Sequence, residues 1–340
     1  MAADPRDPLA DLKRIAFLLE KAGESTYRVK AFRSAATAIA GRDDLAERAT
    51  AGTLGELRGV GEVTARCIGE SLAGEEPVYL RRLEATGGEP VAVGGERIRA
   101  ALRGDCHSHT DASDGGSPLV EMVSAAIDLG HDYLVITDHS PRLTVANGLS
   151  AERLSKQLKQ IAKVNEAVAP FRVLTGIEVD ILDDGSLDQQ DELLAQLDVV
   201  VASVHSGLRM GREQMTERML AAVQNPHTDI LGHCTGRKVK GKNRPESEFD
   251  PARIFPACAS AGTAVEINSR PDRLDPPKRL LRLAIEAGCL LSIDSDAHAP
   301  GQLDWQPYGC ERAALSGAPV DHIVNTWPVD ELLAWTAGQR

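Results

Sequence analysis

Hydrophobic positions recur at helical spacing through the first part of the chain. Three segments carry apolar side chains three or four positions apart, as one face of a helix requires: residues 9–21, 26–40 and 61–73. Short turns that contain glycine separate these segments. The helical pattern stops at the glycine-rich stretch 87–96. We therefore predict a small all-α domain over residues 1–86, followed by a linker over residues 87–98.

The pattern changes beyond residue 98, where short β-branched runs alternate with helical runs. The apolar runs are DYLVITDH, RVLTGIEV, LDVVVASVH, TDILGH, TAVEI and CLLSID. Such alternation is typical of repeated β-α units around a buried parallel sheet. We therefore predict one α/β domain over residues 99–340.

Polar residues mark the ends of these apolar runs at a regular interval. They fall at His109, His139, Glu178, His205, His233, Glu266 and Asp296. The successive gaps are 30, 39, 27, 28, 33 and 30 residues, and about 30 residues is the size of one β-α unit. Seven such ends predict a barrel or near-barrel of seven strands, whose carboxyl ends converge on one face.

Six of the nine histidines lie at or beside these predicted strand ends. Together with three carboxylates they give nine candidate metal ligands: His107, His109, Asp114, His139, Glu178, His205, His233, Asp296 and His298. A mixture of imidazole and carboxylate suits zinc, manganese or iron better than calcium. Because nine ligands exceed what one tetrahedral ion uses, we predict two or three divalent ions.

Two more carboxylates stand outside this set. Asp138 directly precedes His139 and faces the other way on an extended strand, which indicates a structural role or a contact to a ligand. Glu266 also ends a predicted strand, and the sequence leaves it open as a ligand, a partner of a ligand or a structural carboxylate.

A basic cluster follows His233 along the chain. Its members are Arg237, Lys238, Lys240, Lys242 and Arg244. Because it lies beside a predicted metal-bearing strand end, we expect Arg237, Lys238 and Lys240 to hold substrate phosphates, with a solvated loop as the alternative. Arg270 and Arg273, after the sixth strand end, are candidates of the same kind.

Composition and charge narrow the class of protein. No apolar run reaches the roughly 18 residues of a membrane span, and the N-terminus lacks the apolar stretch of a signal peptide. We therefore expect a cytoplasmic protein that does not bind a membrane. The formal net charge of −12 argues against broad nonspecific affinity for nucleic acid, although it leaves room for a local basic face.

The second domain carries the motifs HSH, SDGG, TDHS, GIEVDI, SVHS, LGH and SDAH, in this order. These motifs resemble those of the PHP (polymerase and histidinol phosphatase) family, and the resemblance spans residues 100–338. It implies a distorted seven-stranded β/α barrel that holds up to three metal ions on the nine residues above. The runs TDHSPRL, GIEVDILDDGSLD and VEINSRPDRLDPP are similar to the C-terminal PHP domain of bacterial family X DNA polymerases. That likeness implies 3′-to-5′ exonuclease or 3′-end phosphoesterase activity.

The first domain resembles the helical DNA-binding domain of the same polymerases. The likeness covers STYRVKAFRSAATAIA and LRGVGEVTARCIGESL, in which Gly59-Val60-Gly61 looks like the turn of a helix-hairpin-helix motif. Backbone N–H groups beside such glycines can approach a DNA phosphate, and Lys30 and Arg33 are further candidate contacts. The alternative is a plain turn between two helices. Residues 1–98 hold 14 basic and 16 acidic residues, so any DNA binding must be local and modest.

Two departures from those polymerases limit the expected activity. The catalytic palm is absent between the two modules, so nucleotide addition is not expected. Cys67 stands where members with lyase activity carry a lysine, so no amine is available there for a Schiff base.

We predict a metal-dependent phosphoesterase that acts on DNA 3′ ends, as an exonuclease or a 3′-phosphatase in DNA repair. The expected step is attack of a metal-bound hydroxide on phosphorus. One alternative is a small-molecule phosphatase of the histidinol phosphatase kind. The other is a non-catalytic DNA-binding or scaffold protein with a decayed site. The complete set of nine ligands counts against decay, and the helix-hairpin-helix segment favours DNA.

Overall fold

The structure, a computed structural model, describes residues 6–87 and 92–339. It divides into two compact units, Met1–Pro90 and Val91–Arg340. Residues 88–91 of the predicted linker lie outside the described residues. None of the described helices has the length and hydropathy needed to span a bilayer.

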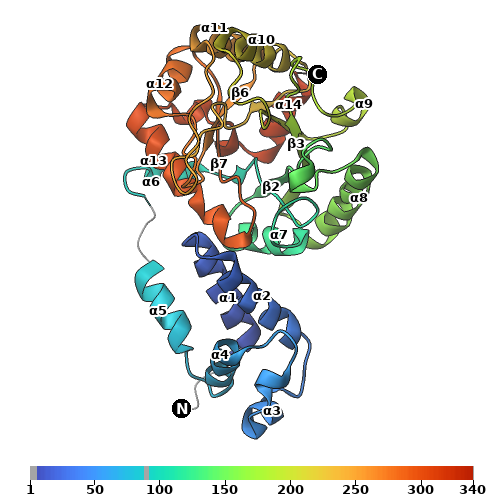
Figure 1. The fold of residues 1–340 in the computed structure, drawn as a ribbon, viewed down its shortest axis with the longest axis vertical. Coiled ribbons are helices and arrows are strands. Elements are labelled where there is room, and N and C mark those ends of the chain that lie inside the picture. Colours follow the sequence, from blue (N-terminus) through green and yellow to red (C-terminus); the bar gives the residue numbers. More distant parts are fainter. Residues whose placement is uncertain (1–5, 88–91, 340) are drawn as a thin grey trace. The chain divides into compact units, whose positions relative to one another are not determined.

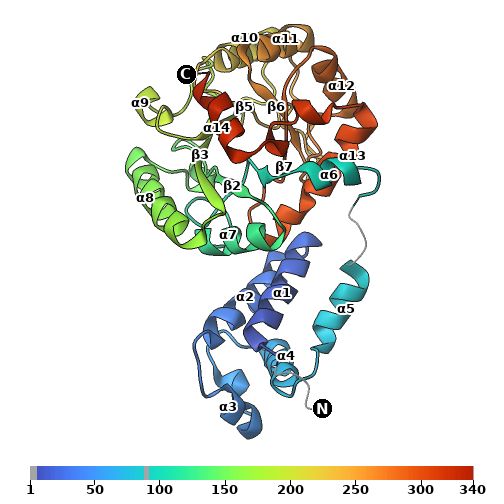
Figure 2. The same cartoon turned by 180° about the vertical axis from the view of Figure 1, so that it is seen from behind.

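The N-terminal unit is built from helices (Figure 2). Its elements are α1 (Pro8–Lys21), α2 (Thr26–Ile39), α3 (Leu45–Ala51), the 3-10 turn η1 (Leu54–Glu56), α4 (Glu62–Leu72) and α5 (Val78–Gly87). Apolar side chains of α1, α2 and α4 form its core, including Leu12, Ile15, Leu19, Phe32 and Ile68. The three helices predicted from apolar spacing are therefore present, with ends within about two residues of the predicted ones.

Local chemistry explains where α1 begins and how it is held. The side chain of Asp7 accepts a hydrogen bond from the N–H of Leu9 at 2.9 Å, and Pro8 occupies the first helical position. The hydroxyl of Ser71 on α4 donates to Asp11 Oδ2 at 2.7 Å in the core. This buried bond joins the first and fourth helices.

The Gly59-Val60-Gly61 turn leads directly into α4. Gly59 has a φ of +95°, which favours glycine, and a Cβ there would lie 3.2 Å from the backbone oxygen of Ser34. Val60 is buried in the helical core. The N–H of Gly61 donates to Thr64 Oγ1 at 2.9 Å, so the side chain of Thr64 satisfies this amide at the start of α4.

The C-terminal unit contains a barrel of seven parallel strands in sequential order (Figure 1). The strands are β1 (Gly104–Asp105), β2 (Tyr133–Ile136), β3 (Arg172–Asp180), β4 (Val199–Ser203), β5 (Ile230–Leu231), β6 (Ala264–Asn268) and β7 (Leu291–Asp294). Each strand pairs in parallel with the next along the chain. The predicted fold class and strand number are confirmed.

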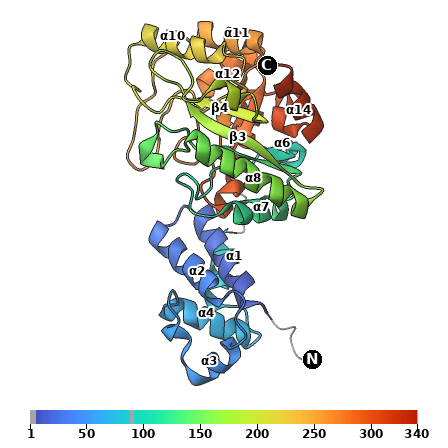
Figure 3. The same ribbon diagram turned by 90° about the vertical axis from the view of Figure 1, so that its right-hand side faces the viewer.

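Helices connect the strands and surround the barrel. They are α6 (Glu96–Ala101), α7 (Leu119–Asp128), α8 (Ala151–Val168), α9 (Asp191–Leu194), α10 (Arg212–Val223), α11 (Pro251–Ala261), α12 (Lys278–Glu286), α13 (Gln306–Ser316) and α14 (Val329–Ala337). Short 3-10 turns lie between them: η2 (Thr144–Ala146), η3 (Pro300–Trp305), η4 (Val320–His322) and η5 (Val324–Thr326). Figure 3 shows α8 lying along β3, and Leu154 and Ile161 of this helix are buried. Strand residues such as Ile177, Val200 and Ile293 are fully buried in the core.

The ring closes between β7 and β1 with few backbone bonds. Ser108 and Ala297 form an isolated parallel bridge just beyond the ends of these strands. The side chain of Asn325 forms two hydrogen bonds with the backbone of Ile293 on β7. Its Nδ2 donates to the Ile293 carbonyl at 2.6 Å, and its Oδ1 accepts from the Ile293 N–H at 3.1 Å. The segments that follow β1 and β7, which carry predicted ligands, are thereby held side by side.

Helix α6 belongs to the barrel unit, although it begins inside the predicted linker. Ile98 and Leu102 are buried in the barrel's hydrophobic core. A Cβ on Gly95 would lie 2.4 Å from the backbone nitrogen of Glu311, so the chain packs closely against α13 here. The proposed boundary between residues 98 and 99 therefore falls within a helix of the barrel unit.

Candidate metal centre

The nine predicted ligands come together at the carboxyl ends of the barrel strands. They come from six strands and the segments that follow them: His107, His109 and Asp114 after β1, His139 after β2, Glu178 within β3, His205 after β4, His233 after β5, and Asp296 and His298 after β7. Parallel strands place all their carboxyl ends on one face of a barrel, so residues far apart in sequence meet there.

Glu178 lies in the middle of this cluster. Its carboxylate is buried and is surrounded by five imidazoles. The shortest nitrogen–oxygen distances are those to His233 (2.8 Å), His139 (2.9 Å), His205 (3.1 Å), His107 (3.3 Å) and His109 (3.5 Å). One carboxylate therefore contacts imidazoles delivered by four different strands.

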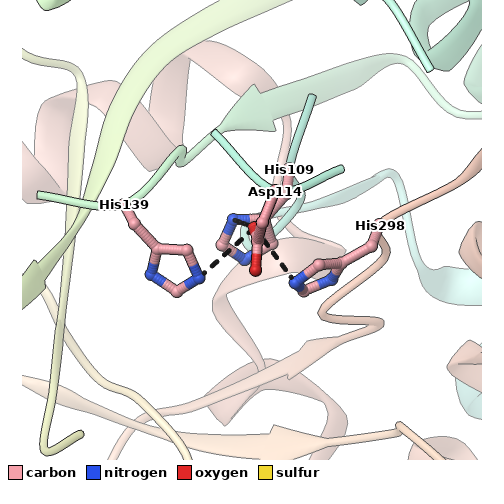
Figure 4. A group of neighbouring side chains, drawn as sticks. All are labelled: His109, Asp114, His139 and His298. Carbon is pink, nitrogen blue, oxygen red and sulfur yellow. Dashed lines mark ion pairs between the residues drawn. The ribbon is translucent and has the colours of Figure 1, made fainter. Parts of the chain in front are cut away.

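Asp114 forms a second centre of contacts at the more open side of the cluster. Its Oδ1 lies 3.4 Å from His298 Nε2, 3.6 Å from His139 Nε2 and 4.0 Å from His109 Nδ1. Figure 4 shows the three rings arranged around this carboxylate. The side chain of Asp114 is 33% exposed, so this part of the cluster can be reached from solvent.

Asp296 completes the set from the β7 side. Its Oδ1 lies 3.6 Å from His109 Nε2 and 3.5 Å from His298 Nδ1. Its backbone has a φ of +53°, a left-handed conformation that non-glycine residues adopt rarely and often at functional sites.

The donor atoms fit bound cations. Three groups have ligand atoms within 4.8 Å of one another: His109, Asp114, His139 and His298; His107, His109 and Glu178; and His139, Glu178 and His205. Both ring nitrogens of the buried His109 have no hydrogen-bond partner in the described part of the chain. Buried polar atoms without partners cost free energy, and coordination of a cation would satisfy them.

The carboxylates and imidazoles of the cluster shift one another's pKa values. Burial opposes ionisation of Glu178, but the neighbouring imidazoles of His139, His205 and His107 outweigh it and hold the pKa of this carboxyl well below its usual range. Burial, together with electrostatic repulsion from the neighbouring imidazoles, lowers the pKa of His109 well below its ordinary value. Burial also disfavours the charged forms of His107 and His205, but Glu178 outweighs it and raises the pKa of His107 well above its ordinary value and that of His205 to about 9. Because metal ligation requires neutral imidazoles, binding of a cation would release protons from these two rings.

Carboxylates behind the ligands fix the orientation of the rings. Glu266 Oε1 lies 2.6 Å from His107 Nδ1, and its Oε2 accepts a hydrogen bond from the N–H of His233. Asp180 Oδ1 lies 3.3 Å from His205 Nδ1. The structure thus places Glu266, which the sequence left open, as a partner of ligands. Such partners orient an imidazole and raise its basicity.

Sequence reasoning missed two residues of this supporting layer, Asp180 and Asn268. The side chain of Asn268 donates to Asp296 Oδ2 at 3.1 Å and to Glu266 Oε2 at 3.3 Å. Each missed residue follows a strand carboxylate, Glu178 or Glu266, by two positions. Since alternate residues of a strand point to the same face, that spacing is the signal that could have found them.

Asp138 holds the turn that delivers Asp114, in agreement with its predicted structural role. It accepts hydrogen bonds from the N–H of Thr110 at 2.8 Å and from the hydroxyls of Thr110 and Ser113. A Cβ on Gly115 would lie 2.7 Å from the backbone of Thr110, so only glycine fits this turn without displacement. The SDGG motif therefore serves to position Asp114.

Arg270 and Arg273 lie at the edge of the cluster. The Nη1 of Arg270 is 3.3 Å from Asp296 Oδ1 and 2.9 Å from His298 Nδ1. The Nε of Arg273 is 3.2 Å from Asp296 Oδ2. Burial favours the neutral form of Asp296, but these two guanidinium groups outweigh it and hold its pKa well below the usual range.

The basic cluster after His233 divides into buried and exposed members. The guanidinium of Arg237 donates to the backbone carbonyls of Arg273 and Leu274, so this side chain braces the loop after β6 and is not free to grip phosphate. Our expectation for Arg237 is corrected accordingly, because the backbone of another segment satisfies its donors. Lys238 is half-buried, 3.5 Å from Asp272, whereas Lys240 is exposed.

The candidate DNA contacts of the N-terminal unit also divide. Lys30 is exposed on α2. Arg33 forms a bidentate ion pair with the buried Glu20, at 2.8 and 2.9 Å, so it joins α2 to α1 and does not offer a free cation.

Known proteins resemble the barrel domain. Residues 105–270 match the family model described as "PHP domain". DNA polymerase/3′-5′ exonuclease PolX of Bacillus subtilis is 38% identical over 69% of this chain and 41% of its own length. The chain thus spans less than half of that relative. A Thermoanaerobacter protein named "probable phosphatase" is 28% identical over 65% of this chain and 89% of its own.

A solved structure is also similar. It is histidinol phosphate phosphatase from Lactococcus lactis, complexed with zinc, L-histidinol and phosphate, with a TM-score of 0.46 and 19% identity over 64% of this chain and 94% of that one. The match of the family model covers the barrel segments that carry seven of the nine clustered residues. Residues 105–270 of this chain therefore form a PHP domain.

Proposed function

We propose that the chain hydrolyses phosphate esters at the 3′ ends of DNA, as a 3′-to-5′ exonuclease, a 3′-phosphatase or both. As a PHP protein with an intact ligand cluster, it is a metal-dependent phosphoesterase. The observation that carries the hydrolytic part of the proposal is the buried Glu178 carboxylate among five imidazoles at the carboxyl ends of the strands. An intact, mutually oriented set of this kind argues against a decayed scaffold.

The cluster would hold two or three divalent ions on the nine residues named above. When bound, such ions neutralise phosphoryl oxygens and lower the pKa of a coordinated water towards neutrality. The protein keeps the donors in place: Glu266 orients His107 and Asp180 orients His205. Arg270 and Arg273 add positive charge beside Asp296, where a phosphate would approach.

The reaction does not depend on a cysteine nucleophile. Cys106 lies between Asp105 and His107, but its side chain is buried in the hydrophobic cluster behind the strand ends. Burial raises the pKa of the Cys106 thiol well above its ordinary value. The thiolate, which is the nucleophilic form, is therefore scarce at neutral pH.

DNA is the proposed substrate because two likenesses agree. This chain is similar over 69% of its length to PolX, whose name includes a 3′-5′ exonuclease. The N-terminal unit is helical and carries the Gly59-Val60-Gly61 turn ahead of α4. A module that binds DNA phosphates would raise the local concentration of DNA ends at the barrel.

A small-molecule phosphatase is the second candidate. It is favoured by relatives named "probable phosphatase", which the chain matches over 89% of their length. A substrate panel separates the two candidates: recessed DNA 3′ ends, DNA with a 3′-phosphate, histidinol phosphate and a small chromogenic ester, each with added manganese. We expect turnover of the DNA substrates, insensitive to base sequence and falling steeply with salt. Efficient turnover of histidinol phosphate without DNA activity would support the second candidate instead.

A further inference from the structure

An open pocket of about 890 Å³ lies beside the metal centre without including any of its ligands. It is lined by Gly207, Leu208, Arg209, Met210, Gln214, Lys238, Lys242, Asn243, Arg244 and Pro245. The lining starts two residues after His205 and five residues after His233, where the chain leaves the carboxyl ends of β4 and β5. The pocket therefore lies at the ligand-bearing end of the barrel.

Hydrogen bonds within the loop after β5, and between it and the loop after β4, hold the walls of the pocket. Lys238 and Arg244 pair as a short antiparallel bridge, with N–H to carbonyl distances of 2.9 and 3.0 Å. The hydroxyl of Ser247 donates to the carbonyl of Leu208 at 2.9 Å, which joins the loop after β5 to the loop after β4. The walls are thus formed before any ligand binds, as is usual for binding sites.

The charged side chains that line the pocket are all cationic. Four of its residues are cations, and none of the described residues that line it is a carboxylate, although the chain as a whole carries a formal net charge of −12. Arg209 and Lys242 are exposed, and neither has an ion-pair partner within residues 6–87 and 92–339. Such a surface attracts an anion.

The uncharged residues of the lining offer contacts to a ligand larger than inorganic phosphate. Leu208 and Met210 are half-buried and offer apolar contact, while the amide side chains of Gln214 and Asn243 can both donate and accept hydrogen bonds. A ligand that would use all of these contacts carries negative charge, a flat apolar face and a hydrogen-bonding edge. A nucleotide has these three properties.

We propose that this pocket binds one nucleotide of the DNA strand whose 3′ end is hydrolysed. The base lies against Leu208 and Met210, and the neighbouring backbone phosphates lie against Arg209 and Lys242. The inference rests on the proposed DNA substrate. A free mononucleotide has the same chemistry, so the experiment includes both ligands.

The test measures binding to the full-length protein of a labelled, phosphorothioate-linked single-stranded oligonucleotide, at several salt concentrations. We expect the double variant Arg209→Ala/Lys242→Ala to raise the dissociation constant about tenfold. It should also lower the slope of log affinity against log salt by about 1.4, since two phosphate contacts to a single strand are lost. Met210→Ala should raise the dissociation constant without changing that slope, because it removes only contact with the base.

Lys159→Ala/Lys163→Ala is the matched control, since it removes two exposed cations from α8. It should leave both affinity and salt slope near the wild-type values. Wild-type affinity and slope in the Arg209/Lys242 variant, while the wild-type chain still degrades DNA, would overturn the pocket and leave the proposed function standing. Binding of deoxyadenosine monophosphate in the pocket by a chain that neither binds nor cleaves DNA would overturn the strand assignment together with the DNA substrate.

Discussion

Glu178 determines the electrostatics of the ligand cluster. It is a buried carboxylate whose oxygens approach imidazoles from four strands, with the shortest distance 2.8 Å to His233. Without its negative charge, the rings around it would lose the carboxylate that five of them share, while Glu266 and Asp180 would still contact one ring each. We therefore expect the charge of Glu178 to be required for cation binding.

Glu178→Gln tests that statement, because it removes the charge and keeps the size. We expect metal content per chain to fall and hydrolysis to drop by about 100-fold or more, since a ligand lost outright should cost at least as much as a lost supporting contact. Elemental analysis and turnover of a small phosphate ester measure the two effects. Glu192→Gln, an exposed glutamate on α9, is the matched control. A metal-replete, fully active Glu178→Gln protein would contradict the assignment.

Glu266 is a positioning residue, since it contacts the ring of His107 and the backbone of His233 but lies behind the ligand atoms. An amide cannot accept hydrogen bonds at both ends of its group. We therefore expect Glu266→Gln to weaken metal affinity by about 10- to 100-fold. Metal titration under chelator competition is the measurement, and activity should return when excess metal is supplied. Loss of activity that excess metal does not restore would argue for a different role.

Strand ends are the elements that bring the site together. β1 and β5 are only two residues long, yet each delivers a histidine to the cluster, because the bridge of Ser108 to Ala297 and the neighbouring strands fix their direction. The amino ends of the strands lie at the opposite end of the barrel from the ligand cluster. His131 lies there, two residues before the start of β2, and is buried.

The burial of His131 predicts a loss of stability in acid. Burial, with a smaller effect from nearby Arg99, lowers the pKa of His131 to about 4 in the folded chain, against an ordinary value of about 6.5. The unfolded chain therefore takes up this proton first. The contribution is fully present above pH 6.5 and is lost as pH falls from about 6.5 to about 4, up to about 3 kcal/mol in total.

Denaturant unfolding at a series of pH values checks this prediction. His131→Leu should unfold with a shallower dependence of free energy on pH between about 6.5 and 4 than the unsubstituted chain. Titration of the metal ligands affects both proteins equally, so the difference between them isolates His131. Parallel curves over that range would contradict the prediction.

The whole molecule consists of two units, each with its own hydrophobic core. We expect the barrel unit to fold alone, provided that α6 is kept. Residues 92–340 retain this helix, whereas residues 99–340 lose Ile98, which is buried in the barrel core. Loss of a buried isoleucine costs about 3 kcal/mol, so we expect the shorter fragment to melt about 5–10 °C lower.

Thermal unfolding of the two fragments measures that difference. Folding of the longer fragment would also permit a direct test of the N-terminal unit: its removal should reduce DNA processing far more than hydrolysis of a small ester. Equal melting temperatures would mean that α6 adds nothing to the barrel. Insolubility of both fragments would mean that the two units do not fold independently.

The sequence by itself determined the barrel, its number of strands and which polar residues gather at their carboxyl ends. Parallel strands have a direction, so a polar residue at the end of each apolar run must arrive at the same face as the others. That local rule is sufficient to bring together residues as distant as His107 and His298. Helical spacing likewise predicted α1, α2 and α4, because the sequence of each segment has its own amphipathic periodicity.

Only the tertiary structure decided which partner each charged side chain meets. Glu266 contacts the ring of His107, and Arg237 donates to the backbone of the loop after β6. Arg33 forms an ion pair with a buried glutamate. The tertiary structure also assigned Ile98 to the barrel and not to a linker. These outcomes depend on contacts between segments that are far apart along the chain. The spacing and type of residues do not predict those contacts. The sequence offers several partners of suitable charge for each side chain, and the packing of the folded chain determines which one it meets.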